Sequence, residues 1–273
     1  MIEFALRTIV AYLLGSLNGA LLLGRLRGVD IRTQGSGNAG GTNALRTQGP
    51  LFAIGVIIID VAKAWIAVKW VPGDVEPGMW LAASCGFAAV LGHVYPIFHG
   101  FRGGKGVATV LGTLLALSPL LLAGVLVIWF VMMFVFGFVG LGSMVAAGAM
   151  PLLVLWAARA GTIEPGEFLP LLWFGVVCAL FVIWTPRSNI ARMRAGTEPR
   201  AKRLWLLGRL RKGLPHQCPS RKPSLRNCRM GGCTRARCWP SLSASRAVRF
   251  GRRSSSCANL VSRSKLTPIK AID

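Results

Sequence analysis

The chain is short of acidic residues, and its apolar part is short of cysteine. Nine Asp and Glu stand against 32 Lys and Arg in 273 residues, which gives a formal net charge of +23. Cys85 and Cys178 are the only cysteines before Pro215, so a disulfide framework is excluded as the scaffold of that part. The other five cysteines lie in a basic tail after Pro215. The charge therefore describes the tail more than the apolar part.

Long apolar runs are what the chain has in abundance. A helix needs about 20 apolar residues to cross a hydrocarbon layer about 30 Å thick. Glu3 precedes the first run and no small-x-small site ends it, which speaks against a cleaved signal peptide. The sequence therefore predicts an all-α, polytopic membrane helical bundle. The runs are residues 9–23, 51–71, 79–98, 107–158 and 168–184.

The charges of the connecting loops predict how the bundle is oriented. Loop 24–50 carries four arginines against one aspartate, and residues 102–105 and 187–200 are also basic. The connection 72–78 is acidic and has no basic residue. Because basic loops stay on the cytoplasmic side, we expect the N-terminus outside and the C-terminus in the cytoplasm.

Residues 102–105 and 187–200 are then on the same side of the membrane, and the run 168–184 between them is one crossing. The uncharged stretch 107–158 must therefore cross the membrane an odd number of times. Its roughly 52 residues would extend about 78 Å as one helix, so three shorter crossings fit better. Pro119 and the glycines between 137 and 142 are the expected breaks, because proline removes a helical donor and glycine weakens helix interiors. This gives about seven transmembrane helices and places Ser143 beside the other polar loops.

The first polar loop is rich in glycine, and Gly35, Gly37 and Gly40 match a G-x-G-x-x-G pattern. A dinucleotide site is not supported, because the loop follows a membrane span rather than the strand of a βαβ unit. Glycines let backbone N–H groups converge on an anion, and the N-terminus of a following helix adds positive potential. The loop is therefore a candidate anion site, with a flexible connection as the alternative.

The second polar loop places Lys105 among Gly103, Gly104 and Gly106. It is not a nucleotide-binding P-loop, because Gly106 stands where Ser or Thr is required and the upstream glycine spacing fails. A lysine in this setting suits a phosphate held as a point charge; the alternative is a lysine that extends toward the membrane interface. His93, at the start of this segment, is more typical of a hydrogen-bonded structural residue than of a base.

The third polar segment, residues 187–199, contains Asn189 close after the last apolar run. The segment is either a basic flank that fixes orientation or a further part of the site, which the neutral Asn189 favours. The apolar part has no His, Cys or carboxylate grouping with metal-ligand spacing, so we expect no metal.

Residues 1–212 closely resemble the bacterial acyl-phosphate:glycerol-3-phosphate acyltransferase family (PlsY). The first two family motifs are long and specific, and they are similar to residues 35–46 and 92–106. The third motif is similar at Asn189, Arg192, Gly196 and Glu198.

Two segments depart from the family pattern. Thr185-Pro186 stands where the third motif usually has an Arg-His pair. A Tyr-x-Ser-x-x-Ser segment aligns with Phe138, Gly140 and Ser143, so only its last serine is retained.

The resemblance implies transfer of a fatty acyl group from acyl phosphate to the 1-hydroxyl of glycerol 3-phosphate, which gives lysophosphatidic acid in phospholipid biosynthesis. It implies a site at the cytoplasmic face of the bacterial inner membrane, no acyl-CoA and no cofactor. The expected partners are both substrates and membrane lipid, with the enzyme that makes acyl phosphate as a further candidate; nucleic acid is not expected. The His-x-x-x-x-Asp signature of the other acyltransferase class is absent from the sequence, which agrees.

The resemblance also suggests roles for individual residues. We expect Ser36, Gly37 and Asn38 with Lys105 to hold the acyl phosphate, and Arg46 to bind glycerol 3-phosphate through its bidentate fork. The base is either a histidine, with His93 as the candidate, or the phosphate of the substrate, which we favour. Further expected phosphate-binding residues are Gly35, Thr42, Gly103, Gly104 and Arg192, and Asn43, Ser143 and Asn189 are expected to orient the acceptor or stabilise an oxyanion.

The tail and one polar pair complete the expectations. Residues 1–212 are expected to form the membrane acyltransferase domain, and residues 213–273 a basic Ser/Arg/Cys-rich tail that is disordered or an accidental extension of the reading frame. The leading alternative function is a membrane transporter or channel for an anionic solute. Asp60 and Lys63 are the candidate polar groups for it within a span, although they can also form a structural i,i+3 bridge.

Overall fold

The computed structural model describes residues 1–73, 78–185, 187–198, 201 and 205, without the side chains of residues 187–189 and 191. The regular structure of the described residues is entirely helical, which confirms the all-α prediction. The predicted boundary between residues 212 and 213 and the tail beyond it lie outside the described residues. The helices are α1 (Ile2–Gly15), α2 (Gly19–Leu26), η1 (Ile31–Thr33), α3 (Gly41–Gln48), α4 (Pro50–Lys69), α5 (Gly78–Val94), η2 (Ile97–His99), α6 (Val107–Leu117), α7 (Pro119–Phe136), α8 (Val139–Arg159), α9 (Pro165–Trp184) and α10 (Arg187–Arg194).

Five of the described helices are long and apolar enough to cross a membrane, and the pair α1 and α2 makes a sixth candidate if it is one bent span. Helices α4, α5 and α9 begin and end within a few residues of the predicted runs, which confirms them. Outward side chains of the long helices are apolar: Leu152 of α8 and Leu180 of α9 are 66% and 67% exposed. Such a surface suits hydrocarbon rather than water. Seven spans and the orientation stay predictions.

The first predicted span, residues 9–23, is wrong in its bounds. Helix α1 ends at Gly15, and α2 continues at an angle of 46°. Asn18 is the cause, because its side chain Oδ1 accepts hydrogen bonds from the backbone N–H groups of Ala20 and Leu21 and so starts a new helix. The chain therefore turns where the apolar pattern alone reads as continuous.

The uncharged stretch 107–158 breaks where the sequence predicted. Ser118 caps α7 just before Pro119, and Gly137 ends α7 with a φ of +75°, a conformation that glycine adopts without strain. The stretch is thus divided into α6, α7 and α8, although α6 has only 11 residues. These breaks return the start of α8 to the end of the bundle that carries the polar loops.

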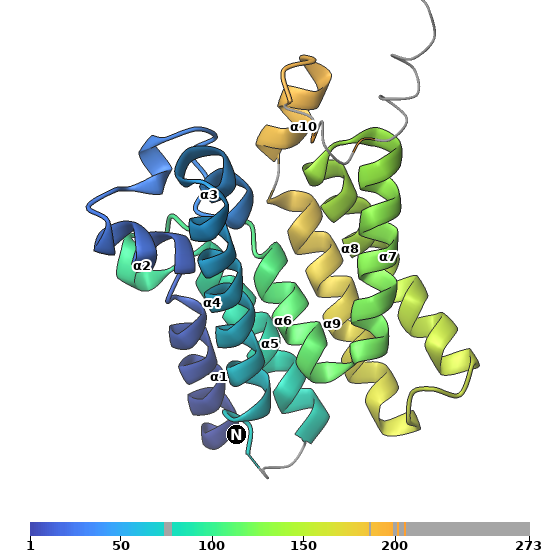
Figure 1. Cartoon of the computed structure of the whole chain (residues 1–273). Helices are drawn as coiled ribbons and strands as arrows, with labels where there is room; N and C mark the ends of the chain where they lie inside the picture. Colours follow the sequence, from blue (N-terminus) through green and yellow to red (C-terminus); the bar gives the residue numbers. More distant parts are fainter. Residues whose placement is uncertain (74–77, 186, 199–200, 202–204, 206–273) are drawn as a thin grey trace, which may run out of the picture. The chain divides into compact units, whose positions relative to one another are not determined.

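Small residues hold the helices close together. α1 packs on α5, α4 on α6, and both α7 and α9 on α8. A Cβ at Gly15 would overlap the backbone of Ala89, and a Cβ at Gly112 would overlap the backbone of Val61. Close backbone approach of this kind is how membrane helices associate when there is no water to exclude. Figure 1 shows α2, α3 and α10 at the opposite end of this bundle from the N-terminus.

Candidate active site

One cavity of about 290 Å³ joins the polar segments that the sequence singled out. Its polar lining comes from the glycine loop (residues 34–40), the lysine loop (residues 100–106), the start of α8, and α10 with the segment after it. The prediction that Ser143 lies beside the other polar loops is therefore confirmed. The expected site residues that line the cavity are Ser36, Asn38, Thr42, Asn43, Arg46, His93, Lys105, Ser143 and Arg192.

Four expected glycines are described by the structure but are not among the residues that line the cavity. They belong to the glycine loop and the lysine loop and are Gly35, Gly37, Gly103 and Gly104. Asn189 belongs to α10, and its side chain lies outside what the structure describes. Within the described part of the chain no three His, Cys, Asp or Glu side chains are grouped as metal ligands.

The glycine loop is held in shape by the buried side chain of Asn43. Its Oδ1 accepts a hydrogen bond from the backbone N–H of Ser36 at 2.9 Å, and its Nδ2 donates to the carbonyls of Ile31 and Gln34. Both amide hydrogens are thus used inside the loop. Gly35 has a φ of +57°, and a Cβ there would overlap Asn43 Oδ1, so glycine is required on both counts. Asn43 therefore fixes the position of Ser36.

The first turn of α3 faces the same cavity. Gly40, Gly41 and Thr42 line it, and no side chain caps this helix end. Unpaired backbone N–H groups and the helix dipole create positive potential there. Arg46, one turn further along α3, adds a full charge. The predicted anion site thus has a helix N-terminus, as expected from its glycines.

The lysine loop folds tightly back on the end of α5. The N–H groups of Gly103 and Gly104 donate to the carbonyls of Val94 and His93 at 3.0 and 3.1 Å. A Cβ at Gly104 would overlap His93 Nε2 and would lie 2.6 Å from the carbonyl oxygen of Ala39. Only glycine allows this approach, which brings the glycine loop and the lysine loop into contact and delivers Lys105 to the cavity.

Lys105 sits in a strongly positive, partly buried environment. Burial, together with the charges of Arg192 and Arg46 and against that of Glu198, lowers the pKa of its ammonium to about 8. Three cations therefore converge on one end of the cavity. Such a cluster favours a bound anion, whose charge would relieve the repulsion.

Arg192 and Glu198 form an ion pair within this cluster. Arg192 Nε lies 2.6 Å from Glu198 Oε2, and the side chain of Glu198 is only 5% exposed. Both residues line the cavity. Glu198 belongs to the third motif, but the sequence analysis did not place it in the site. The feature that could have indicated it is that Glu198 is the only acidic residue of that basic segment.

Ser143 is oriented by Trp129, a residue that the sequence did not single out. Trp129 Nε1 donates to Ser143 Oγ at 3.2 Å, and Ser143 Oγ lies 3.0 Å from the carbonyl oxygen of Val139. Trp129 also lines the cavity. Nothing in the sequence marks this tryptophan among the apolar residues of α7.

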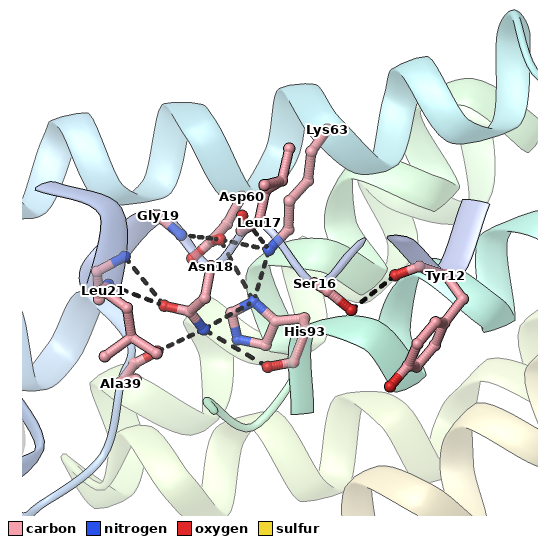
Figure 2. A network of polar contacts seen from close by, with 11 residues as sticks. Tyr12, Ser16, Leu17, Asn18, Gly19, Leu21, Ala39, Asp60, Lys63 and His93 are labelled. Atoms are coloured by element: carbon pink, nitrogen blue, oxygen red, sulfur yellow. Dashed lines mark hydrogen bonds and ion pairs between the residues drawn. The ribbon is translucent and has the colours of Figure 1, made fainter. Parts of the chain in front are cut away.

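Asp60 and Lys63 form the predicted i,i+3 bridge, with 2.8 Å between Oδ1 and Nζ. His93 joins them through its Nδ1, which Asn18 Nδ2 also contacts, as Figure 2 shows. Asn18 Nδ2 also donates to Ala39 O in the glycine loop. His93 is thus a buried, hydrogen-bonded residue, and the cluster ties α4, α5 and both loops together.

The other end of the cavity is apolar. It continues between α6, α7, α8 and α9 without a charged side chain. A lining of this kind accepts an alkyl chain and excludes water. The residues of this end are Val110, Leu111, Val125, Leu126, Ala146, Ala147, Met150 and Val182.

Comparisons of the sequence with known proteins point to one family. Residues 5–196 match the family model described as glycerol-3-phosphate acyltransferase. A protein of that name from Geobacter sulfurreducens is 44% identical over 205 residues, covering 74% of this chain and 100% of the relative. One from Chlorobaculum tepidum is 38% identical over 227 residues, covering 73% and 97%.

Solved structures give the same answer. The crystal structure of PlsY, an integral membrane glycerol 3-phosphate acyltransferase, in its glycerol 3-phosphate form is 35% identical with a TM-score of 0.62, covering 72% of this chain and 94% of PlsY. The lysophosphatidic acid form is 33% identical with a TM-score of 0.64, covering 75% and 98%. On the extent of these matches, the chain belongs to the glycerol-3-phosphate acyltransferase family, PlsY.

Proposed function

We propose that this protein transfers a fatty acyl group from acyl phosphate to the 1-hydroxyl of glycerol 3-phosphate and releases lysophosphatidic acid. One observation carries the proposal: a single cavity has a cluster of cations and loop N–H groups at one end and an apolar lining at the other. A donor with a phosphate and an alkyl chain matches both ends. The glycerol 3-phosphate form and the lysophosphatidic acid form of PlsY support the acceptor and the product.

The polar end offers positions for two phosphates. Lys105, Ser36 and Asn38 lie where the glycine loop and lysine loop meet, and we assign the acyl phosphate to them. Arg46 and Arg192 are left for glycerol 3-phosphate, because a guanidinium binds a phosphate through two parallel hydrogen bonds. Asn43 acts as a positioning residue for Ser36, since its amide is already used within the loop.

The reaction needs no protein nucleophile, because acyl phosphate is an activated mixed anhydride. The 1-hydroxyl oxygen attacks the acyl carbon, a new C–O ester bond forms, and the bond from the acyl carbon to the phosphate oxygen breaks. The hydroxyl proton passes to a phosphate oxygen of the substrate, and inorganic phosphate leaves. The protein contributes orientation and charge stabilisation, which supply much of the reduction of the barrier.

We place this site at the cytoplasmic face of the bacterial inner membrane, on the loop charges. The acyl chain then enters from the membrane and glycerol 3-phosphate from the cytoplasm, with the enzyme that makes acyl phosphate as a candidate neighbour. The transporter alternative is disfavoured, because Asp60 and Lys63 are buried and form an ion pair with each other. Asp60 also accepts a hydrogen bond from the backbone N–H of Gly19, and Lys63 donates one to the carbonyl of Leu17. Residues 213–273 take no part, so truncation after Gly213 should leave the rate of acyl transfer unchanged.

The decisive experiment is a comparison of donors. The purified full-length protein is incubated with labelled glycerol 3-phosphate and either palmitoyl phosphate or palmitoyl-CoA, and labelled lysophosphatidic acid is quantified. We expect product from palmitoyl phosphate alone. Product from the CoA thioester at a similar rate would contradict the proposed donor, and no product from either would contradict the proposed activity.

A further inference from the structure

The buried ring of His93 is contacted on one nitrogen by three polar groups. The side chain is 3% exposed. Its Nδ1 lies 3.0 Å from Lys63 Nζ, 3.4 Å from Asn18 Nδ2 and 3.3 Å from Asp60 Oδ1. Figure 2 shows these groups gathered on the same edge of the imidazole. Which of them donate and which accept decides where the ring carries its proton.

Lys63 settles the first contact by its geometry. An ammonium group has three N–H donors and no acceptor. Lys63 Nζ has three partners at bonding distance: Asp60 Oδ1 at 2.8 Å, the carbonyl oxygen of Leu17 at 3.1 Å and His93 Nδ1 at 3.0 Å. The first two are oxygens that accept. The charged Lys63 therefore uses its third hydrogen on His93 Nδ1, which must then be an acceptor.

Asn18 and Asp60 lead to the same assignment. The Oδ1 of Asn18 accepts from the backbone N–H groups of Ala20 and Leu21, which turns its Nδ2, a donor, toward His93. Asp60 Oδ1 already accepts from Lys63 and from the backbone N–H of Gly19 at 3.0 Å. Among the described residues Nδ1 thus faces two donors and one acceptor, Asp60 Oδ1, which already accepts two other hydrogen bonds.

The opposite nitrogen of the ring faces the substrate loops. A neutral imidazole that accepts at Nδ1 carries its hydrogen on Nε2. Nε2 lies against Gly104, so close that a Cβ there would overlap it, and His93 lines the cavity next to Lys105. Among the described residues none accepts a hydrogen bond from Nε2.

We propose that the Asp60–Lys63 pair, together with Asn18, fixes His93 as a neutral imidazole protonated on Nε2, which donates a hydrogen bond to an oxygen of the substrate beside Lys105. Asp60 and Lys63 are positioning residues that act through His93, and the ring is a donor rather than a proton acceptor. The identity of the oxygen, a phosphoryl oxygen or the developing oxyanion of the acyl group, rests on the proposed function. The tautomer does not, because it follows from the protein's own contacts.

The tautomer is measured directly by ¹⁵N NMR of the histidine rings in the purified full-length protein. The chain has three histidines, so the His93 signals are assigned by their loss in H93Q. We expect a protonated Nε2 and an unprotonated Nδ1 in the wild type. A proton on Nδ1 would overturn the proposal without any variant being needed.

Two lysine variants test what sets the tautomer. In Lys63→Met the donor to Nδ1 is gone, so the proton should move to Nδ1 and bond to Asp60. Lys69→Met is the matched control, since Lys69 is an exposed residue at the end of the same helix, and it should keep the wild-type spectrum. An unchanged tautomer in a folded Lys63→Met protein would refute the role of the pair.

Activity separates a donor from a base at this position. A glutamine side chain carries an N–H donor but cannot accept a proton at neutral pH, so H93Q should keep the rate of lysophosphatidic acid formation within about fivefold, whereas H93A should lose about 100-fold, as removal of one such donor does. Equal losses in both folded variants would contradict the donor role. If the wild type formed no lysophosphatidic acid, the proposed function would fail, while the NMR result would still decide the tautomer.

Discussion

The two halves of the described bundle differ in what they bury. Among the described residues of α1 to α9 and their loops, all eight buried polar residues lie before residue 118, whereas the interior of α7, α8 and α9 is apolar. Buried charge is expensive to desolvate and is kept only where its partners are in place. The first half uses this polar interior to fix the two anion-binding loops. The second half supplies the apolar wall, so the cavity between them has one end for phosphate and one for an alkyl chain.

Removal of a charge at the phosphate end of the cavity should reduce activity more than any change at the apolar end. Lys105→Met takes one of three clustered cations from the cavity, and we expect kcat/KM for acyl phosphate to fall about 100- to 1000-fold. Arg102→Met is the control, because Arg102 is exposed in the same loop and does not line the cavity. A Lys105→Met protein as active as the control would show that the phosphate lies elsewhere.

Asn43→Ala should disturb the polar half through the shape of its loop. The substitution leaves the N–H of Ser36 and the carbonyls of Ile31 and Gln34 without their partner, each at a cost of about 1–3 kcal/mol if it stays buried. We expect a lower Tm and roughly a 30-fold loss of kcat/KM. This loss is smaller than that expected from removing the charge of Lys105 and larger than that expected from removing a surface contact.

Gln48→Ala serves as the control for Asn43. It removes a side-chain hydrogen bond to Gln34 from the other end of the same helix, while the Asn43 contacts remain. Its activity should stay close to that of the wild type. Full activity of Asn43→Ala, measured beside this control, would contradict the role of Asn43 in positioning Ser36.

Ala147→Phe tests the apolar half alone. Ala147 is buried and lines the cavity, so the larger ring should shorten the space for the alkyl chain. We expect kcat/KM to fall about tenfold for a long-chain acyl phosphate relative to a short-chain one, which is the usual size of such discrimination in an apolar pocket. Leu152→Phe, on the exposed face of the same helix, is the control. An equal loss with both chain lengths would mean that this end does not hold the chain.

The pH dependence should show the smallest effect and belongs to the phosphate end. The pKa of Lys105 is lowered to about 8, so its charge is present below that pH and is lost above it. Because kcat/KM reports the ionisation of the free enzyme, it should decline as the pH rises through about 8. Lys105→Arg, which stays charged, should lose this decline even if its rate is lower. A decline that persists in Lys105→Arg would assign it to another group.

The sequence alone predicted the features that depend on local composition. Apolar runs marked α4, α5 and α9, and Pro119 and Gly137 marked the breaks in the long uncharged stretch. The spacing of Asp60 and Lys63 predicted their bridge, because three residues is nearly one helical turn. These predictions needed no knowledge of distant parts of the chain.

The features that the sequence could not predict depend on contacts between distant segments. Asn18 caps α2 and also touches His93 and the glycine loop, yet in the sequence it is one polar residue inside an apolar run. Trp129 meets Ser143 only because Gly137 turns the chain back between them. Each side chain acquires its role from a partner that the folded bundle brings to it.

The most direct test of one cavity shared by two halves is a single assay of lysophosphatidic acid formation. Purified full-length wild type, Lys105→Met and Ala147→Phe are compared with labelled glycerol 3-phosphate and acyl phosphates of two chain lengths. We predict that the wild type forms product with both, that Lys105→Met loses both equally, and that Ala147→Phe loses mainly the longer chain. Absence of product from a folded wild-type protein, or the same chain-length profile in all three, would contradict the account.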